Sequence, residues 1–202
     1  KVISSMGINC RSTNLIIDGG NMVPCGPYIV MTDKVFSENR KKKDDWEFKA
    51  LLDSELGHPV IIIPWTSHED DVYGHSDGFI KWCGDNRILM GNHGDCYPEE
   101  AASIRRILES YGFEVTEIRF KGKVDKPCYD LNWAYINFLQ VGKNIIMPKF
   151  NIEEDAIAQQ YIQEAFPDCC IRQIEMEEIA KEGGALHCLS WNVYLPKTHV
   201  KR

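Results

Sequence analysis

The sequence predicts an α/β fold built from three copies of a ββαβ unit. Three segments share one pattern, an apolar strand, a turn and a second apolar strand that ends in methionine: Cys25–Met31, Cys83–Met90 and Val141–Met147. The last two turns contain Gly and Asn, which tolerate the positive φ angles of tight hairpins. The three methionines are 59 and 57 positions apart, which gives a repeat of about 58 residues.

A helix and a third strand are expected after each hairpin. Apolar residues recur at helical spacing over 44–56, 98–111 and 152–165, and the last two segments begin with acidic residues. The predicted third strands are Val60–Ile63, Phe113–Ile118 and Cys170–Ile174. We expect one domain over 1–202, with repeats at about 14–74, 75–131 and 132–182 and a closing strand at 186–194.

The length of the repeat indicates a propeller or array in which neighbouring units bury one another's edges. Three units rarely close a ring, and the chain begins with Lys1 instead of Met. We therefore expect part of the assembly to precede Lys1. A chain lacking that part is expected to form a homo-oligomer or to associate with the missing N-terminal part, because strand edges and apolar faces are left open.

Composition excludes several classes of protein. A net charge of −7 disfavours nucleic acid as a partner and is compatible with a cationic ligand. No apolar run approaches the length of a membrane span, so no membrane partner is expected. The eight cysteines form no C-x-x-C pair, which argues against a zinc site. Reduced thiols in a cytoplasmic protein are the simpler interpretation.

Two glycine-rich segments hold candidate site residues in the first half of the chain. Asp18-Gly19-Gly20-Asn21 follows a predicted apolar strand, Asn14 to Ile17, and reads equally well as an ordinary turn. Gly74 to Gly78 places His75 and Asp77 just before the second unit, where sheet ends often form sites. A solvated loop histidine beside a turn aspartate is the alternative for that pair.

Two further candidates lie in the second half. Asn137 stands inside the predicted apolar strand Trp133 to Phe138 and needs a hydrogen-bond partner, which could be purely structural. Cys188 follows Gly183 and Gly184 and could be a nucleophile, or an inert cysteine at the start of a strand. His187 is a poor candidate for its base, because adjacent side chains on a strand point to opposite faces.

In order and spacing, these four segments resemble the agmatine deiminases and bacterial peptidylarginine deiminases of the pentein guanidine-modifying superfamily. The family pattern is acidic-or-Thr-Gly-Gly-Asn, Gly-His-x-Asp, aromatic-x-Asn-Phe and Gly-Gly-x-x-His-Cys. Here it reads Asp18–Asn21, Gly74–Asp77, Tyr135–Phe138 and Gly183–Cys188. Penteins are five-bladed α/β propellers of ββαβ units. The resemblance therefore implies a pentein-type propeller with about three of its five blades in this chain.

The resemblance also implies a mechanism. Cys188 would attack the guanidinium carbon, His75 would act as general acid and base, and Asp77 would hold the guanidinium group. Asp18 would orient His75 or bind the guanidinium, although Asp is shorter than the Glu common in relatives. A covalent intermediate would give ammonia and a ureido product with no metal or organic cofactor. Further substrate contacts would come from Asn137, Asn21, Gly184 and Trp191.

The partner that the resemblance implies is a small guanidine. Agmatine, converted to N-carbamoylputrescine, is the first candidate, and an arginine-containing peptide is the alternative. The family's upstream Arg-Asp-x-Gly-Pro-like segment has no equivalent in this sequence. A non-catalytic pentein that serves binding or assembly is therefore a second reading, and amidino transfer to an amine is a third.

Overall fold

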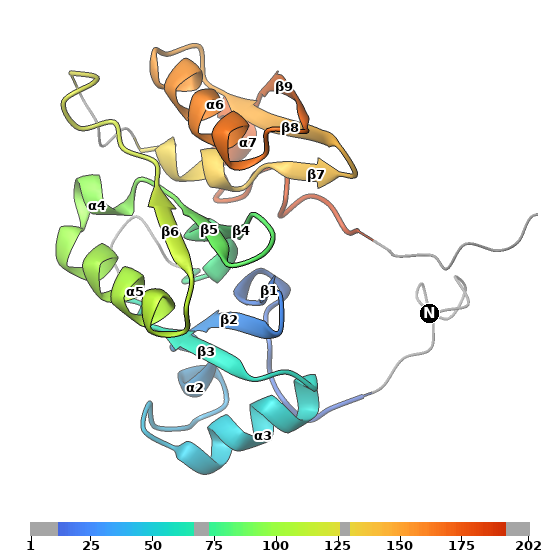
Figure 1. The fold of residues 1–202 in the computed structure, drawn as a ribbon. Helices are drawn as coiled ribbons and strands as arrows, with labels where there is room; N and C mark the ends of the chain where they lie inside the picture. The colour runs from blue at the N-terminus through green and yellow to red at the C-terminus, as the bar shows by residue number, and fades with distance from the viewer. Residues whose placement is uncertain (1–11, 67–72, 126–129, 193–202) are drawn as a thin grey trace, which may run out of the picture.

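The computed structural model describes residues 12–66, 73–125 and 130–192, and it contains three consecutive ββαβ units (Figure 1). The first unit comprises η1 (Gly19–Asn21), β1 (Val23–Cys25), β2 (Tyr28–Thr32), α2 (Lys34–Glu38), α3 (Trp46–Leu56) and β3 (Val60–Ile63). The second comprises η2 (Ser76–Gly78), β4 (Ile80–Trp82), β5 (Arg87–Met90), α4 (His93–Cys96), α5 (Pro98–Ser110) and β6 (Glu114–Glu117). The third comprises η3 (Asn132–Ile136), β7 (Leu139–Val141), β8 (Asn144–Lys149), α6 (Glu154–Ala165) and β9 (Cys170–Glu175), and α7 (Glu177–Ala180) follows it.

Each unit forms its own three-stranded sheet, with orders β1-β2-β3, β4-β5-β6 and β7-β8-β9. The hairpin strands are antiparallel, and the third strand is parallel to the second because a helix crosses over between them. The methionine positions are equivalent in the parallel registers, where Met31 faces Ile62, Met90 faces Glu117 and Met147 faces Gln173. The predicted hairpins, long helices and third strands are confirmed.

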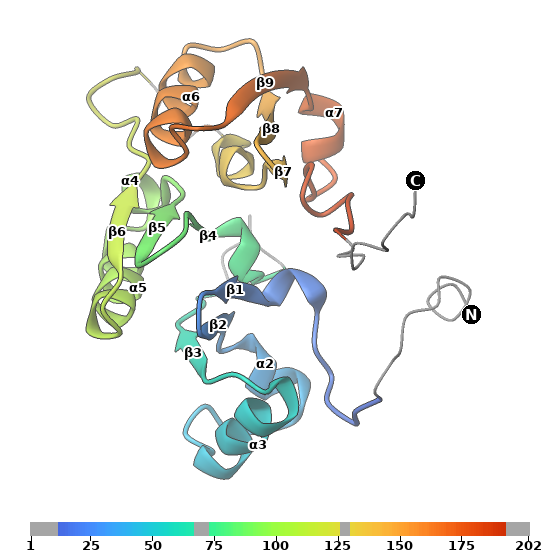
Figure 2. The same ribbon diagram turned by 45° about the vertical axis from the view of Figure 1, so that its right-hand side comes forward.

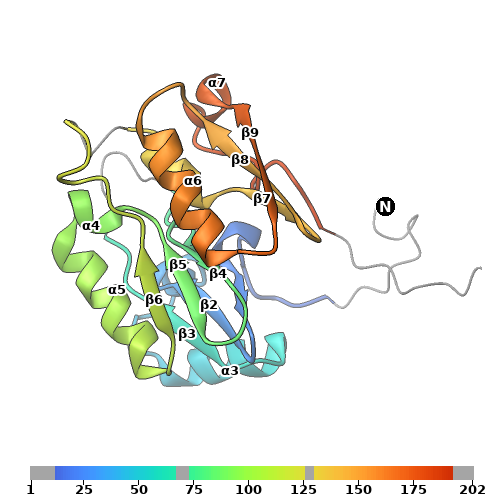
Figure 3. The same cartoon turned by 45° about the horizontal axis from the view of Figure 1, so that its top comes forward.

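The units are arranged as an arc. In Figures 1 and 2 the first strands, β1, β4 and β7, face a common centre, and the long helices α3, α5 and α6 lie on the outside. Figure 3 shows α6 alongside β8 and β9. The core continues from unit to unit: Ile104 and Leu108 of α5 pack with Ile61 of β3, and Ile162 of α6 packs in a cluster with Leu89 of β5. Packing of each helix against the preceding sheet fixes neighbouring units relative to one another.

Three expected strands are absent. Residues 14–17 form none, because the side chain of Asn39 bonds both the amide and the carbonyl of Ile16, at 2.9 and 2.8 Å. The segment 133–138 is mostly the 3-10 helix η3, which begins its unit as η1 and η2 begin theirs. In the predicted closing strand, 186–194, the described residues to 192 form turns, with Leu189 N bonded to Ala185 O at 3.1 Å. Residues 193 and 194 lie outside the described residues.

A buried carboxylate joins the start of the third unit to its helix. Asp155 accepts hydrogen bonds from Tyr135 Oη at 2.7 Å, Phe150 N at 2.9 Å and Ile152 N at 3.1 Å. Replacing Asp155 with Ala removes the acceptor of these three hydrogen bonds. The bonds from Tyr135 and Phe150 are buried. We expect the free energy of unfolding to fall by about 3 kcal/mol.

The measurement is urea unfolding followed by circular dichroism, beside Glu153→Ala. Glu153 is the exposed acid two positions earlier and is expected to change the free energy of unfolding by less than about 0.5 kcal/mol. Equal unfolding midpoints for the two variants would contradict this role of Asp155.

Candidate active site

The site lies where two of the unit-opening 3-10 turns meet the loop at 183–190. Asp18 directly precedes η1 and His75 directly precedes η2, while Asp77 lies within η2 and Cys188 within the loop. Three segments that are far apart in the sequence are thus brought to one region, as the family pattern predicts. The spacing follows from the repeat, since each unit begins with the same kind of turn.

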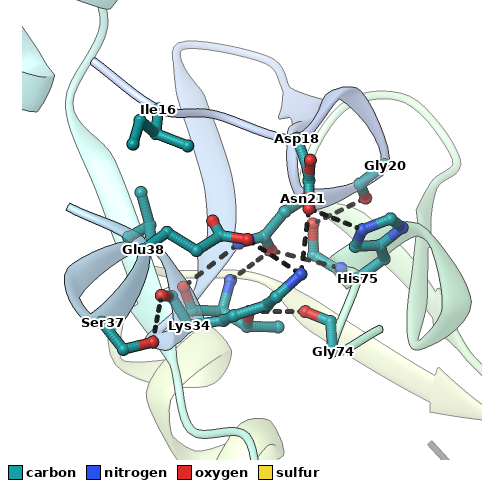
Figure 4. Close-up of polar contacts among 12 residues, drawn as sticks. Ile16, Asp18, Gly20, Asn21, Lys34, Ser37, Glu38, Gly74 and His75 are labelled. Atoms are coloured by element: carbon teal, nitrogen blue, oxygen red, sulfur yellow. Dashed lines mark hydrogen bonds and ion pairs between the residues drawn. The ribbon is translucent and has the colours of Figure 1, made fainter. Parts of the chain in front are cut away.

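Asp18 holds His75 in place (Figure 4). Nε2 of His75 lies 3.1 Å from Oδ2 of Asp18, and Nζ of Lys34 donates to the same oxygen at 2.9 Å. These two partners, Lys34 first, lower the pKa of Asp18 to about 2. Asp18 is therefore ionised at neutral pH, and its side chain is long enough to reach His75 despite being one methylene shorter than Glu.

Glycine is required beside this histidine. A Cβ atom at Gly20 would stand 2.5 Å from Nδ1 of His75, closer than side-chain atoms approach one another. Any other residue there would displace the imidazole ring from Asp18. The Gly-Gly pair of the first motif therefore makes room for the histidine of the second.

Asn21 has a structural role, and its predicted contact with substrate stays a prediction. Its side chain is fully buried, and its Oδ1 accepts hydrogen bonds from Thr32 N at 2.7 Å and Ser76 N at 3.4 Å. Its Nδ2 faces the carbonyl of Thr32 at 3.4 Å. Asn21 thereby fastens η1 to β2 and to η2, which fixes the distance between Asp18 and His75.

Asn137 occupies the equivalent position in the third unit and has a related role. Its side chain is fully buried, and its Oδ1 accepts from His187 N at 3.1 Å and Cys188 N at 3.2 Å. Its backbone carbonyl also accepts from His187 N, at 3.0 Å. Its oxygen positions the loop that presents Cys188, and its side chain also lowers the pKa of both Asp77 and Cys188, so it adjoins these two groups. Its role as a substrate contact stays a prediction.

Cys188 and Asp77 face each other. The Sγ atom of Cys188 lies 3.9 Å from Oδ2 of Asp77, whose side chain is only 5% exposed. Burial raises the pKa of Asp77, and His75 and Lys81 partly offset that effect. Partial burial and the charge of Asp77 raise the pKa of the Cys188 thiol. A cation bound between the two groups would favour both the carboxylate and the thiolate.

A pocket of about 280 Å³ opens beside this pair. Its polar lining includes Asp77, Lys81, Gln140, His187 and Asn192. Gly184 is close to the nucleophile, since a Cβ there would lie 3.5 Å from Cβ of Cys188, an ordinary contact. Trp191 does not line the pocket and is 60% exposed, and its contact with substrate stays a prediction.

Sequence reasoning missed three residues of the site: Lys34, Lys81 and His187. Lys34 lies just after β2 and Lys81 lies within β4, and neither lysine belongs to one of the sequence motifs. The predicted strand at 186–194 made His187 a poor candidate for the base. The structure has a turn at 186–189 instead, so that argument no longer applies. No group of three metal-ligating side chains occurs among the described residues, and no helix there is long and apolar enough to cross a membrane.

The sequence matches a known protein family and several curated relatives. The sequence model of the Porphyromonas-type peptidyl-arginine deiminase family matches residues 1–193. A putative agmatine deiminase of Streptococcus mutans is 36% identical over 95 residues, which cover 47% of this chain and 22% of that protein. The agmatine deiminase of Ectopseudomonas mendocina is 24% identical over 212 residues, covering 89% of this chain and 57% of the relative.

Solved structures show the same fold. The agmatine deiminase of C. jejuni superposes with a TM-score of 0.75 at 18% identity, over 93% of this chain and 58% of that one. A dimethylarginine dimethylaminohydrolase gives a TM-score of 0.54 at 12% identity, over 93% of this chain and 64% of the other. The ββαβ units thus form part of a pentein propeller.

The chain belongs to the Porphyromonas-type peptidyl-arginine deiminase family. It spans about 57% of the length of the agmatine deiminase of Ectopseudomonas mendocina.

The pair formed by Cys188 and Asp77 has a measurable consequence. Because the pKa of the thiol is raised above its usual 9.0, alkylation of Cys188 by iodoacetamide should keep accelerating above pH 9. Asp77→Asn removes a negative charge 3.9 Å from the sulfur, so the midpoint of the rate profile should move to lower pH.

Peptide mass spectrometry separates Cys188 from the other cysteines. Asp18→Asn is the matched control, because Asp18 bonds His75 and Lys34 and not the thiol, and it should leave the profile of Cys188 unchanged. A midpoint in Asp77→Asn that equals or exceeds that of the unmodified chain would show that the carboxylate does not act on the thiol.

Proposed function

We propose that this chain is the catalytic part of a hydrolase that removes ammonia from a guanidine group. The observation that supports it best is the facing pair of Cys188 and Asp77, with Sγ and Oδ2 3.9 Å apart, in the family's motif positions. A carboxylate that is largely buried needs a cationic partner, and a guanidinium ion is planar and suited to carboxylates. The nucleophile would then lie beside the bound cation.

In the proposed reaction the Cys188 thiolate attacks the guanidinium carbon. The bond from that carbon to a terminal nitrogen breaks, and His75 gives a proton to the departing ammonia. The product of this half-reaction is an amidino group bound to Sγ. His75 then takes a proton from water, whose oxygen attacks the same carbon and releases the thiol and a ureido product.

The electrostatics of the free site support assistance by the substrate. Without a ligand, burial and Asp77 hold the pKa of Cys188 above its usual value, so the thiol is protonated at neutral pH. A bound guanidinium adds positive charge beside both Asp77 and Cys188. The nucleophile is therefore activated mainly when the substrate is present.

Agmatine is the substrate that the curated relatives favour by name, and the name of the matching family points to peptidyl-arginine. The pocket beside Asp77 has a mixed polar and apolar lining that fits an aliphatic chain attached to the guanidine. A non-catalytic pentein that serves binding or assembly is the second candidate.

Activity is tested by release of ammonia and ureido product from agmatine and from a blocked arginine peptide, on the longest natural form of the protein. Cys188→Ala should abolish turnover, and His75→Ala should lower kcat by at least about 100-fold, in line with general acid–base catalysis. Cys170→Ala, which removes another exposed thiol, is the matched control and should retain full activity.

Turnover of one substrate that disappears in Cys188→Ala establishes the reaction and selects amine or peptide. Adding a primary amine as acceptor tests for amidino transfer, which would yield a new guanidine and less ureido product. A folded protein that turns over neither substrate would overturn the deiminase proposal and favour a role in binding.

A further inference from the structure

Lys81 on β4 places an ammonium group next to the loop that presents the nucleophile. Its Nζ donates to the carbonyl oxygen of Phe138 at 3.2 Å and lies 4.8 Å from the centroid of the Phe138 ring. The same Nζ lies 3.4 Å from Nδ1 of His187. These contacts hold the charge in one position beside His187, in a side chain that is partly buried.

The contact with the ammonium defines the tautomer of the imidazole. An ammonium group offers three N–H donors and no acceptor, so the nitrogen that it meets must provide a lone pair. Nδ1 of His187 is therefore unprotonated, and the ring proton resides on Nε2. Nε2 is the atom that faces the carboxylate of Asp77, 3.9 Å from Oδ2.

We propose that Lys81 is a positioning residue that keeps His187 neutral, with its proton on Nε2 facing Asp77, so that His75 alone exchanges protons in the site. The two histidines contact groups of opposite charge. His75 meets the carboxylate of Asp18 at 3.1 Å, whereas His187 meets an ammonium group, which opposes a gained proton. The division of roles rests on the proposed deiminase reaction, but the protonation state of His187 does not.

The charges around His187 agree with this arrangement. Burial and the charge of Lys81 lower the pKa of His187 to about 4. Burial lowers the pKa of Lys81 to about 8, although Asp77, Cys188 and Cys83 raise it, so Lys81 is mostly charged at neutral pH. The titratable groups that face His187 among the described residues are Asp77 from η2, Lys81 from β4 and the adjacent Cys188.

A neutral His187 matters for substrate binding. A protonated imidazole 3.9 Å from Asp77 would be a permanent cation competing with the guanidinium for the same carboxylate. Held neutral, His187 leaves the charge of Asp77 for the substrate. The hydrogen bonds of Lys81 go to Phe138 O and to His187, and not to Asp77.

The test is a pH series of long-range ¹H–¹⁵N spectra of the chain labelled with ¹⁵N-histidine, with His187→Asn to assign the signals. His187 should show the Nε2–H tautomer and stay neutral down to about pH 5. In Lys81→Met its pKa should rise but stay below the ordinary value near 6.5, because burial, the larger cause of the lowering, remains. Lys81→Arg keeps the charge and should retain the low pKa.

A His187 signal with its proton on Nδ1, or one that titrates near pH 6.5 in the unmodified chain, would overturn the proposal, as would an unchanged pKa in Lys81→Met. The tautomer in the unmodified chain decides the question even if Lys81→Met does not fold. Since these spectra need no turnover, their outcome is separate from that of the ammonia assay. In a protein that does turn over, Lys81→Met should additionally raise KM for the guanidine at pH 6 more than at pH 8.

Discussion

The site depends on two buried asparagine side chains: Asn21 ties the start of the first unit to the second, and Asn137 ties the start of the third unit to the loop that bears Cys188. Asn21 accepts hydrogen bonds from Thr32 N and Ser76 N, and Asn137 accepts them from His187 N and Cys188 N. Both are fully buried, where an unsatisfied backbone amide would cost about 1–3 kcal/mol. The turns that bear His75, Asp77 and Cys188 therefore stay together only while these amide oxygens are in place. The asparagines act on the chemistry through the backbone that they hold.

The charged groups that these asparagines position are arranged for a cationic ligand. Asp18 is neutralised by Lys34 and His75, whereas Asp77 is largely buried and faces a thiol. Burial raises the pKa of Asp77, and the charge of Asp77 in turn raises the pKa of the Cys188 thiol. A bound guanidinium would favour both anions. In the proposed reaction, binding of the substrate and activation of the thiol are therefore one event.

The parts of the fold set by local pattern were predictable from the sequence, and the parts set by contacts between units were not. Gly-centred turns and apolar helical stripes identify the hairpins, helices and third strands, because those signals act within a few residues. The segment 133–138 is rich in apolar residues and was predicted to be a strand, but it is buried between units and becomes η3. The motif order predicted Cys188, His75, Asp77 and Asp18 as site residues. The roles of Asn21, Asn137 and Lys81 depend on partners 11 to 106 positions away, which no local pattern encodes.

The most direct test of the central claim is to trap the covalent intermediate. The longest natural form of the protein would be mixed with a guanidine substrate, quenched in acid within one turnover, digested and analysed by mass spectrometry. The account predicts an amidino adduct of the substrate on the peptide that contains Cys188, and no such adduct in Cys188→Ala. Turnover that proceeds with Cys188 unmodified, or an adduct on another cysteine, would contradict the assignment of the nucleophile and with it the proposed site.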